Sequence, residues 1–300
     1  MHDAARLARV ISVGRNAAWI VFEDEDVVRL AALRKNVDRI TLVPGDLVRA
    51  RRLEDERVVV DAREPRDFTL ERTTPGGRTK TMAANVDGLA IVAAFARPAM
   101  HVPMIDELIA FAELHGITAR LFFTKADLAA TAGPGALEVP QTYRALGYTA
   151  LVIDARDVAG AAALIAALES SRSLLIGQSG VGKSTLFARL GGPADIGAVS
   201  KIGRGKQTTT TGRLLRFPGG FLIDSPGFGE FELDGVTAAE LSRGFVEFAQ
   251  PAAACRFGDC RHRDEPECGV RGAVAAGTVA SSRYASYRAI LERPAVRRPR

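Results

Sequence analysis

Residues 177–184 read Gly-Gln-Ser-Gly-Val-Gly-Lys-Ser and follow the apolar run 173–176. This is the GxxxxGK[ST] pattern of a phosphate-binding loop, set between an apolar strand and a helix-compatible segment. The glycines of such a loop let backbone N–H groups wrap the phosphates. We expect Lys183 to neutralise the β- and γ-phosphates of a nucleotide and Ser184 to ligate Mg²⁺. The predicted phosphate-binding residues are Gly177, Gln178, Ser179, Gly180, Val181, Gly182, Lys183, Ser184 and Thr185.

A second motif, Asp-Ser-Pro-Gly at 224–227, ends the apolar run 221–223. The Asp224 carboxylate, at the tip of a strand, would reach the magnesium shell, and the Gly227 N–H would meet the γ-phosphate. Alone, the tetrapeptide is also an ordinary turn. Its position about forty residues after the phosphate loop favours the phosphate-binding interpretation.

The tetrapeptide Thr-Lys-Ala-Asp at 124–127 follows another apolar run, 121–123. Asp127 can accept hydrogen bonds from guanine N1–H and the 2-amino group, while the Lys125 stem covers the ring. Adenine lacks that pair of donors, so a buried Asp127 would discriminate against it. The start of a capped helix is the alternative for so common a tetrapeptide. The predicted guanine-binding residues are Thr124, Lys125, Ala126, Asp127 and Ala155, the last through its N–H to O6.

Residues 203–211 form a glycine-flanked polar run that ends in four threonines. Thr208 or Thr209 could coordinate Mg²⁺ and sense the γ-phosphate, and the sequence does not choose between them. A flexible loop is the simpler reading, and a nucleotide switch is also a flexible loop. The guanine motif here precedes the phosphate loop, although the cyclic order of the motifs is that of a G protein. This order predicts a circularly permuted GTPase domain, a rearrangement that α/β domains with neighbouring termini tolerate.

The three cysteines of the chain all lie in one cluster with the pattern C-x4-C-x-H-x5-C. Three thiolates and one imidazole suit a closed, tetrahedral, structural Zn²⁺ site. Three unrelated buried thiols are the alternative, which the turn residues between the cysteines disfavour. The predicted zinc ligands are Cys255, Cys260, His262 and Cys268.

Three kinds of sequence pattern predict the elements that position these groups. Five short alternating apolar stretches before residue 66 predict an OB-like β-barrel, and the Arg-, Pro-, Thr- and Gly-rich segment 63–80 reads as a linker or surface strap. Longer apolar runs that alternate with helical periods predict a parallel sheet flanked by helices. After residue 230 we expect helices near 237–249 and 281–292 around the cysteine cluster.

We therefore expect a multidomain protein in three parts. The first, 1–66, is the OB-like barrel; the second, 67–229, is a central α/β P-loop GTPase domain that is circularly permuted; the third, 230–300, is a C-terminal helical zinc-binding module. A composition of 47% hydrophobic and 25% charged residues is that of a globular protein, which excludes a disordered, collagen-like or coiled-coil chain. No membrane-spanning run or signal peptide is evident, so we expect a cytoplasmic protein, and a monomer.

The formal net charge of +5 lies in the last twenty residues, which hold six Arg and one Glu, so the rest of the chain is neutral. This asymmetry favours a polyanion near the C-terminus, with a solvated basic tail as the alternative. We expect the helix at 281–292 to present its arginines to solvent, where they could meet phosphates of structured RNA. The candidate RNA-facing residues are Arg49, Arg51, Arg52, Lys201, Arg204, Lys206, Arg283, Arg288 and Arg293.

The permuted motif order, the phosphate loop, the threonine run, Asp-Ser-Pro-Gly-Phe and the flanking modules resemble the RsgA (YjeQ) family of ribosome small-subunit-dependent GTPases, over about 6–293. The resemblance implies hydrolysis of GTP to GDP and phosphate during late maturation of the small ribosomal subunit, with rRNA binding and stimulation by the subunit. It also implies Mg²⁺ with GTP and one structural Zn²⁺.

Three positions depart from the usual patterns. The family usually has His before the threonines where this chain has Gln207, and Asn where it has Thr124. Ras-like enzymes have a water-orienting Gln where this chain has Phe228. We therefore expect Gln207, Lys183, Thr208 and Thr209 to be catalytic, with Gln207 as a bystander the alternative. The rival functions are a nucleotide-switched RNA-binding assembly factor with incidental hydrolysis, and a P-loop ATPase.

Overall fold

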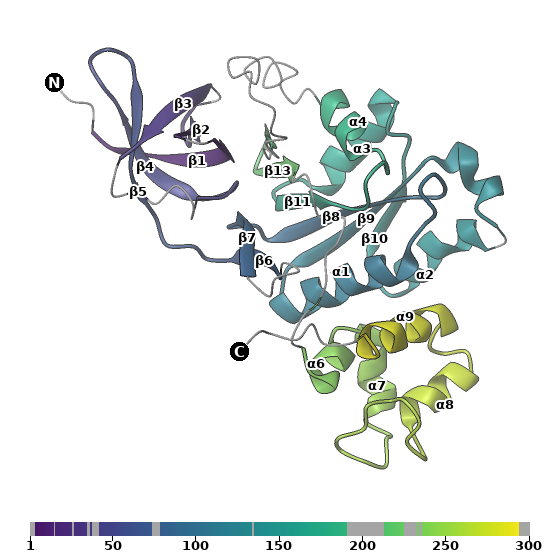
Figure 1. Ribbon diagram of the computed structural model, residues 1–300. Coiled ribbons are helices and arrows are strands. Elements are labelled where there is room, and N and C mark those ends of the chain that lie inside the picture. Colours follow the sequence, from purple (N-terminus) through teal and green to yellow (C-terminus); the bar gives the residue numbers. More distant parts are fainter. Residues whose placement is uncertain are drawn as a thin grey trace.

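The protein is described by a computed structural model of the 300-residue chain (Figure 1). The described residues are 4–14, 16–25, 27–34, 37, 42–73, 79–133, 135–190, 213–224, 233 and 236–293.

The N-terminal part is a closed five-stranded barrel (Figure 1). Its strands are β1 (Arg6–Val13), β2 (Ala17–Phe22), β3 (Val28–Leu33), β4 (Leu47–Arg52) and β5 (Val58–Arg63). The strand order is β1-β2-β3-β5-β4, and β3 pairs with β5 in parallel while the other pairs are antiparallel. Small and β-branched residues such as Ala8, Val10 and Ile20 fill the interior. The predicted OB-like barrel is confirmed, and its closure leaves no free sheet edge.

Part of the segment 63–80, expected to be a linker or surface strap, forms a two-stranded ribbon, so it is not a linker without regular structure. Strand β6 (Thr69–Thr73) pairs antiparallel with β7 (Thr79–Ala84). The ribbon forms because Leu70 and Ala83 are fully buried in the core of the next domain. It also adjoins the barrel: Pro44 accepts a backbone hydrogen bond from Ala84.

The central part is a six-stranded sheet in the order β10-β9-β8-β11-β13-β12. Its strands are β8 (Gly88–Ala94), β9 (Thr118–Thr124), β10 (Thr149–Val152), β11 (Arg172–Ile176), β12 (Arg213–Phe217) and β13 (Gly220–Asp224). All neighbours are parallel except β12 and β13. The strand order reverses between β8 and β11, which in open α/β sheets is where ligands bind, at the carboxyl ends of the strands.

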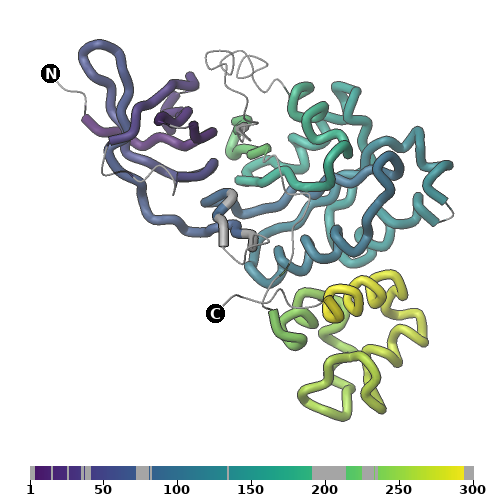
Figure 2. The backbone as a smooth tube through the Cα atoms, in the orientation of Figure 1, coloured from purple at the N-terminus to yellow at the C-terminus, as the bar shows by residue number. Residues whose placement is uncertain are grey.

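Helices cover both faces of this sheet (Figures 1 and 2). They are α1 (Val102–His115), α2 (Val139–Ala145), α3 (Val158–Ala167) and α4 (Lys183–Arg189), with short 3₁₀ turns η2 (Ala126–Thr131) and η3 (Ala136–Glu138). Strand β8 is buried throughout, and its side chains alternate between the two cores. Leu89 and Ile91 pack with α1 and α2, whereas Ala90 and Val92 pack with α3 and α4.

The C-terminal part is helical, as predicted, and Figure 1 shows it beside α1. Its elements are α6 (Ala238–Arg243), η5 (Val246–Phe248), α7 (Ala249–Ala252), α8 (Gly269–Ala275) and α9 (Ser281–Leu291). The single helix expected at 237–249 is interrupted at Gly244, where a Cβ would lie 2.7 Å from the Ala110 Cβ of α1. Among the described helices, none has the length and apolarity needed to cross a membrane.

Candidate nucleotide site and metal centre

The phosphate-loop motif lies where β11 ends and α4 begins. Gly177 passes so close to β8 that a Cβ on it would meet the Val92 carbonyl oxygen at 2.0 Å, and Gly182, at a φ of +105°, precedes α4. Both positions therefore require glycine. Ser179, Gly180, Ser184 and Thr185 are exposed, as ligand-facing groups must be.

Lys183 is turned back into this loop. Its Nζ donates hydrogen bonds to the carbonyl oxygens of Gly177 at 2.5 Å and Gln178 at 2.6 Å. Partial burial lowers the Lys183 pKa, and the nearby Asp224 carboxylate opposes that shift. Asp224 is the last residue of β13 and is buried. The ammonium and the carboxylate therefore lie near each other at the carboxyl edge of the sheet, the position of the ligand crevice in open α/β sheets.

The predicted guanine motif is bonded directly to the phosphate loop. The buried Thr124 hydroxyl, at the end of β9, donates to the Val181 carbonyl oxygen at 2.6 Å. The Lys125 Nζ donates to the carbonyl oxygens of Gly180, at 2.7 Å, and of Arg97. The bonds to Val181 and Gly180 span more than fifty residues of sequence. They join two motifs whose order along the chain is permuted.

The other residues predicted to bind the guanine base lie at the same edge of the sheet. Ala126 and Asp127 are exposed at the start of η2. Ala155 is buried beyond the end of β10, and a Cβ on Gly182 would lie 3.3 Å from its methyl group. The structure thus brings the 124–127 segment, Ala155 and the phosphate loop together.

Several sequence-predicted residues fall outside the described part of the chain. They are Lys201, Arg204, Lys206, Gln207, Thr208, Thr209, Gly227 and Phe228.

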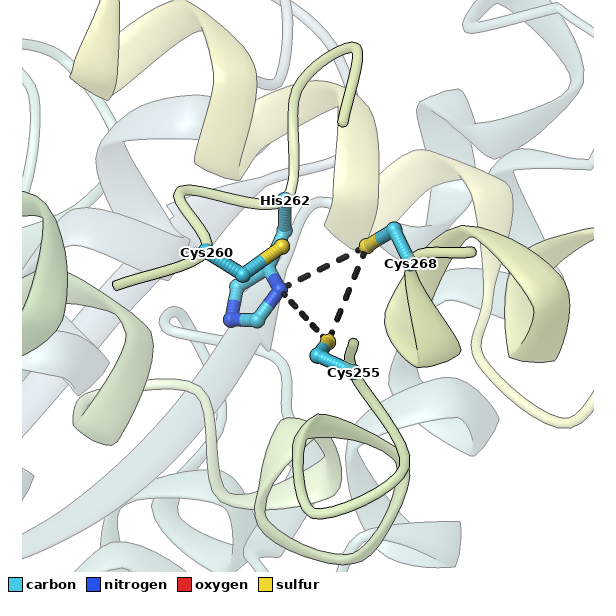
Figure 3. A group of neighbouring side chains, drawn as sticks. All are labelled: Cys255, Cys260, His262 and Cys268. Atoms are coloured by element: carbon cyan, nitrogen blue, oxygen red, sulfur yellow. Dashed lines mark hydrogen bonds between the residues drawn. The ribbon is translucent and has the colours of Figure 1, made fainter. Parts of the chain in front are cut away.

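The four predicted zinc ligands converge on one point in the C-terminal part (Figure 3). The His262 Nδ1 lies 3.5 Å from the Sγ atoms of both Cys255 and Cys268, which are 3.9 Å apart. A tetrahedral Zn²⁺ with ordinary Zn–S and Zn–N bonds requires S···S edges of about 3.8 Å and S···N edges of about 3.5 Å. All four ligand atoms, including that of Cys260, lie within 4.8 Å of one another. The cluster can bind a metal ion, and its donors and spacing fit Zn²⁺.

Neighbouring groups hold these ligands in place. The Ser242 hydroxyl lies 3.0 Å from the His262 Nε2, which leaves Nδ1 facing the thiols, and the Gly269 N–H donates to the Cys255 Sγ at 3.3 Å. The Tyr284 hydroxyl of α9 donates to the His262 carbonyl oxygen at 2.7 Å. The tyrosines of α9 therefore contact the metal-binding loops. Such outer contacts orient metal ligands.

The structure corrects the prediction that Arg283 faces solvent. Its side chain is 1% exposed and donates to Asp106 at 2.7 Å and to Glu247 at 2.6 and 3.0 Å. Burial alone would lower its pKa, but these two carboxylates raise it. Arg283 shares a helical face with Tyr287 and Ile290, at spacings of four and seven, and that pattern could have revealed its burial.

The other described arginines proposed to face RNA are paired within the protein. Their carboxylate partners are Glu64 for Arg49, Asp61 for Arg51, Glu25 for Arg52, Glu292 for Arg288 and Glu107 for Arg293.

Strand order, phosphate loop and permuted motif positions together define a circularly permuted P-loop GTPase. Residues 63–234 match the family described as RsgA GTPase. The chain belongs to the RsgA GTPase family, which confirms the predicted family and the predicted class of enzyme, a GTP hydrolase.

Similar proteins cover most of the chain. The small ribosomal subunit biogenesis GTPase RsgA of Chromohalobacter salexigens is 41% identical, over 96% of this chain and 86% of that protein. Its counterpart from Azotobacter vinelandii is 43% identical, over 86% of this chain and 76% of that protein. The crystal structure of YjeQ from Thermotoga maritima superposes with a TM-score of 0.73 at 30% identity, over 97% of this chain and all of that one. The crystal structure of YloQ, a circularly permuted GTPase, shares the fold, with a TM-score of 0.69 at 24% identity. The match covers 99% of this chain and 97% of that one.

Proposed function

We propose that this chain hydrolyses GTP to GDP and phosphate in late maturation of the small ribosomal subunit, as a cytoplasmic monomer that binds rRNA and is stimulated by the subunit. The main support for nucleotide binding is the pair of hydrogen bonds from Thr124 and Lys125 to the phosphate loop. These bonds place both motifs at one site. The ribosomal part is supported by relatives named for that process.

In this proposal each described side chain of the crevice has one role. Asp127 accepts from guanine N1–H and the 2-amino group, and the Ala155 N–H donates to O6. Lys183 exchanges its two carbonyl partners for β- and γ-phosphate oxygens. Ser184 and Asp224 would hold Mg²⁺, which neutralises charge that develops on the phosphates.

Hydrolysis itself is assigned to residues known from the sequence. Thr208 or Thr209 would complete the magnesium shell, and the Gly227 N–H would contact the γ-phosphate. Gln207 can present both a donor and an acceptor to the attacking water. Contact with rRNA would complete this arrangement, which would make turnover depend on the subunit.

Zn²⁺ at the Cys255, Cys260, His262 and Cys268 cluster would be structural, because four protein ligands fill a tetrahedral shell and leave no position for water. It would tie the loops before α8 to the α9 tyrosines.

The test compares nucleotide competition with turnover. We expect GTP, but not ATP, to displace labelled GDP, and small subunits to accelerate phosphate release. Lys183→Ala should abolish GTP binding, whereas Arg189→Ala, an exposed cation on the same helix α4, should leave it intact. Equal displacement by ATP would refute guanine recognition. GTP-dependent subunit binding without accelerated turnover would instead support the switched assembly factor.

A further inference from the structure

The segment that follows β10 carries an arginine held in one position by a carboxylate. Asp154 accepts the Arg156 backbone N–H at 2.9 Å, its Nε at 3.0 Å and its Nη2 at 2.8 Å. These bonds lower the pKa of Asp154 to about 2. Gly160 of α3 packs against this turn so closely that a Cβ on it would lie 2.2 Å from the Asp154 carbonyl oxygen. The Asp154 carboxylate therefore holds the guanidinium, and α3 packs against the turn that carries Asp154.

This guanidinium lies beside the carboxylate proposed to recognise guanine. The Arg156 Nη2 is 3.5 Å from the Asp127 Oδ2, and about half or more of each side chain is exposed, at 64% and 50%. A donor and an acceptor thus stand next to each other at the base side of the crevice. An exposed pair of this kind contributes little to stability, and its exposed donor and acceptor are accessible to a ligand.

Guanine presents the complementary pattern along one continuous edge. Its N1–H and 2-amino donors adjoin the O6 acceptor, and N7 follows as a second acceptor. Arginine is the side chain that most often binds O6 and N7, because its parallel N–H groups match both. Adenine reverses the pattern, with an amino donor in place of O6, so it would face Arg156 donor against donor.

The other side-chain donors of the guanine motif are already engaged. A threonine hydroxyl has one hydrogen to donate, and that of Thr124 goes to Val181 within the fold. The Lys125 ammonium donates to two backbone carbonyls. Arg156 has five N–H donors, and the bonds to Asp154 and Asp127 use one side of its guanidinium.

We propose that Arg156, positioned by Asp154, is a specificity-determining residue that donates to O6 and N7 of the bound guanine while Asp127 accepts from N1–H and the 2-amino group. The inference rests on the proposed GTP function and adds to it a side chain that selects the acceptor edge of the base.

The test measures affinity for GDP, 7-deaza-GDP and ADP by calorimetry in the full chain with Mg²⁺. Replacing N7 by carbon removes one acceptor and leaves the donors that face Asp127. The parent should bind 7-deaza-GDP about tenfold more weakly than GDP, as expected for one lost bond to a charged donor. Arg156→Met should lose about 10- to 100-fold in GDP affinity and bind GDP and 7-deaza-GDP alike. Arg156→Lys should recover part of both effects.

The chain offers a matched control in the barrel. Arg57 is held by Asp55, two residues earlier, through its backbone N–H and its Nε, the same local arrangement as in the Asp154 turn. Arg57→Met should leave all three affinities unchanged.

Either of two results for Arg156→Met would overturn the inference without overturning the proposed function. If Arg156→Met keeps parental GDP affinity, or still discriminates against 7-deaza-GDP as the parent does, Arg156 does not contact the acceptor edge. If the parent itself does not prefer GDP to ADP, the GTP function fails and the inference fails with it.

Discussion

The buried arginine of α9 is the interaction whose loss should be most costly in the C-terminal part. Arg283→Met keeps the apolar stem but leaves Asp106 and Glu247, whose side chains are 0% and 6% exposed, without their cation. Removing one partner of a buried pair costs about 3–5 kcal/mol, because the remaining charge stays desolvated. The guanidinium also lies 4.5 Å from the centre of the Phe245 ring, a contact that the substitution also removes.

The same helix provides the control. Arg288 pairs with Glu292 one turn away at 2.6 Å, but both side chains are more than a third exposed. Such a pair is worth about 0.3–0.5 kcal/mol. Arg288→Met therefore changes the same residue type on the same helix with little expected effect.

Hydrogen exchange of peptides that cover 281–291 measures the local unfolding of α9 directly. A loss of 3 kcal/mol or more corresponds to about a 100-fold or greater loss of protection, at 1.36 kcal/mol per factor of ten. We expect this loss for Arg283→Met and less than about a threefold change for Arg288→Met. Equal protection of the two variants would show that the buried network does not hold α9 in place, and the reasoning from burial would be refuted.

Three further predictions follow from single residues. Cys268→Ser should reduce bound zinc, measured by elemental analysis, from one ion per chain to none, and retention of the ion would contradict the four-ligand site. Gly45→Ala should lower the melting temperature far more than Gly116→Ala: both have positive φ, but only at Gly45 would the Cβ meet a backbone oxygen, that of Ala84, at 2.1 Å. Gln207→Ala should lower subunit-stimulated turnover more than GTP affinity, and parental turnover would make Gln207 a bystander.

Features encoded in local patterns could be predicted from the sequence. Barrel strands β4 and β5 alternate at their starts with period two. Central strands β8, β11 and β13 are nearly continuous buried runs, and β8 is buried on both faces as such a run requires. The phosphate loop depends on glycines whose close contacts appear at Gly177 and Gly182. The cysteine spacing was sufficient because metal ligands must converge on one point.

Features that depend on distant partners could not be predicted in this way. Strand β12 is a short edge strand whose only described neighbour in its sheet is β13. Helix α2 has only seven residues and begins at Val139, just before a proline. The approach of Arg156 to Asp127 joins two turns that follow different strands, so no spacing rule reports it. Arg283 lay on an apolar helical face, but its charge suggested solvent until its two carboxylate partners were located.

Helix α1 connects the nucleotide crevice with the metal-binding part. It begins shortly after Arg97, whose carbonyl oxygen accepts from the guanine-motif lysine. Farther along, the adjacent acids Asp106 and Glu107 point in different directions, about 100° apart on a helix. Asp106 holds Arg283, and Glu107 binds Arg293 at 2.7 and 2.9 Å.

These contacts determine how a displacement at the guanine motif is accommodated. If the start of α1 moves, α9 must either move with it or separate from Asp106 and Glu107. Separation would break buried ion pairs at a cost of about 3–5 kcal/mol for the Arg283 network, whereas joint movement leaves those pairs intact. Joint movement of α1 and α9 therefore costs less free energy than their separation.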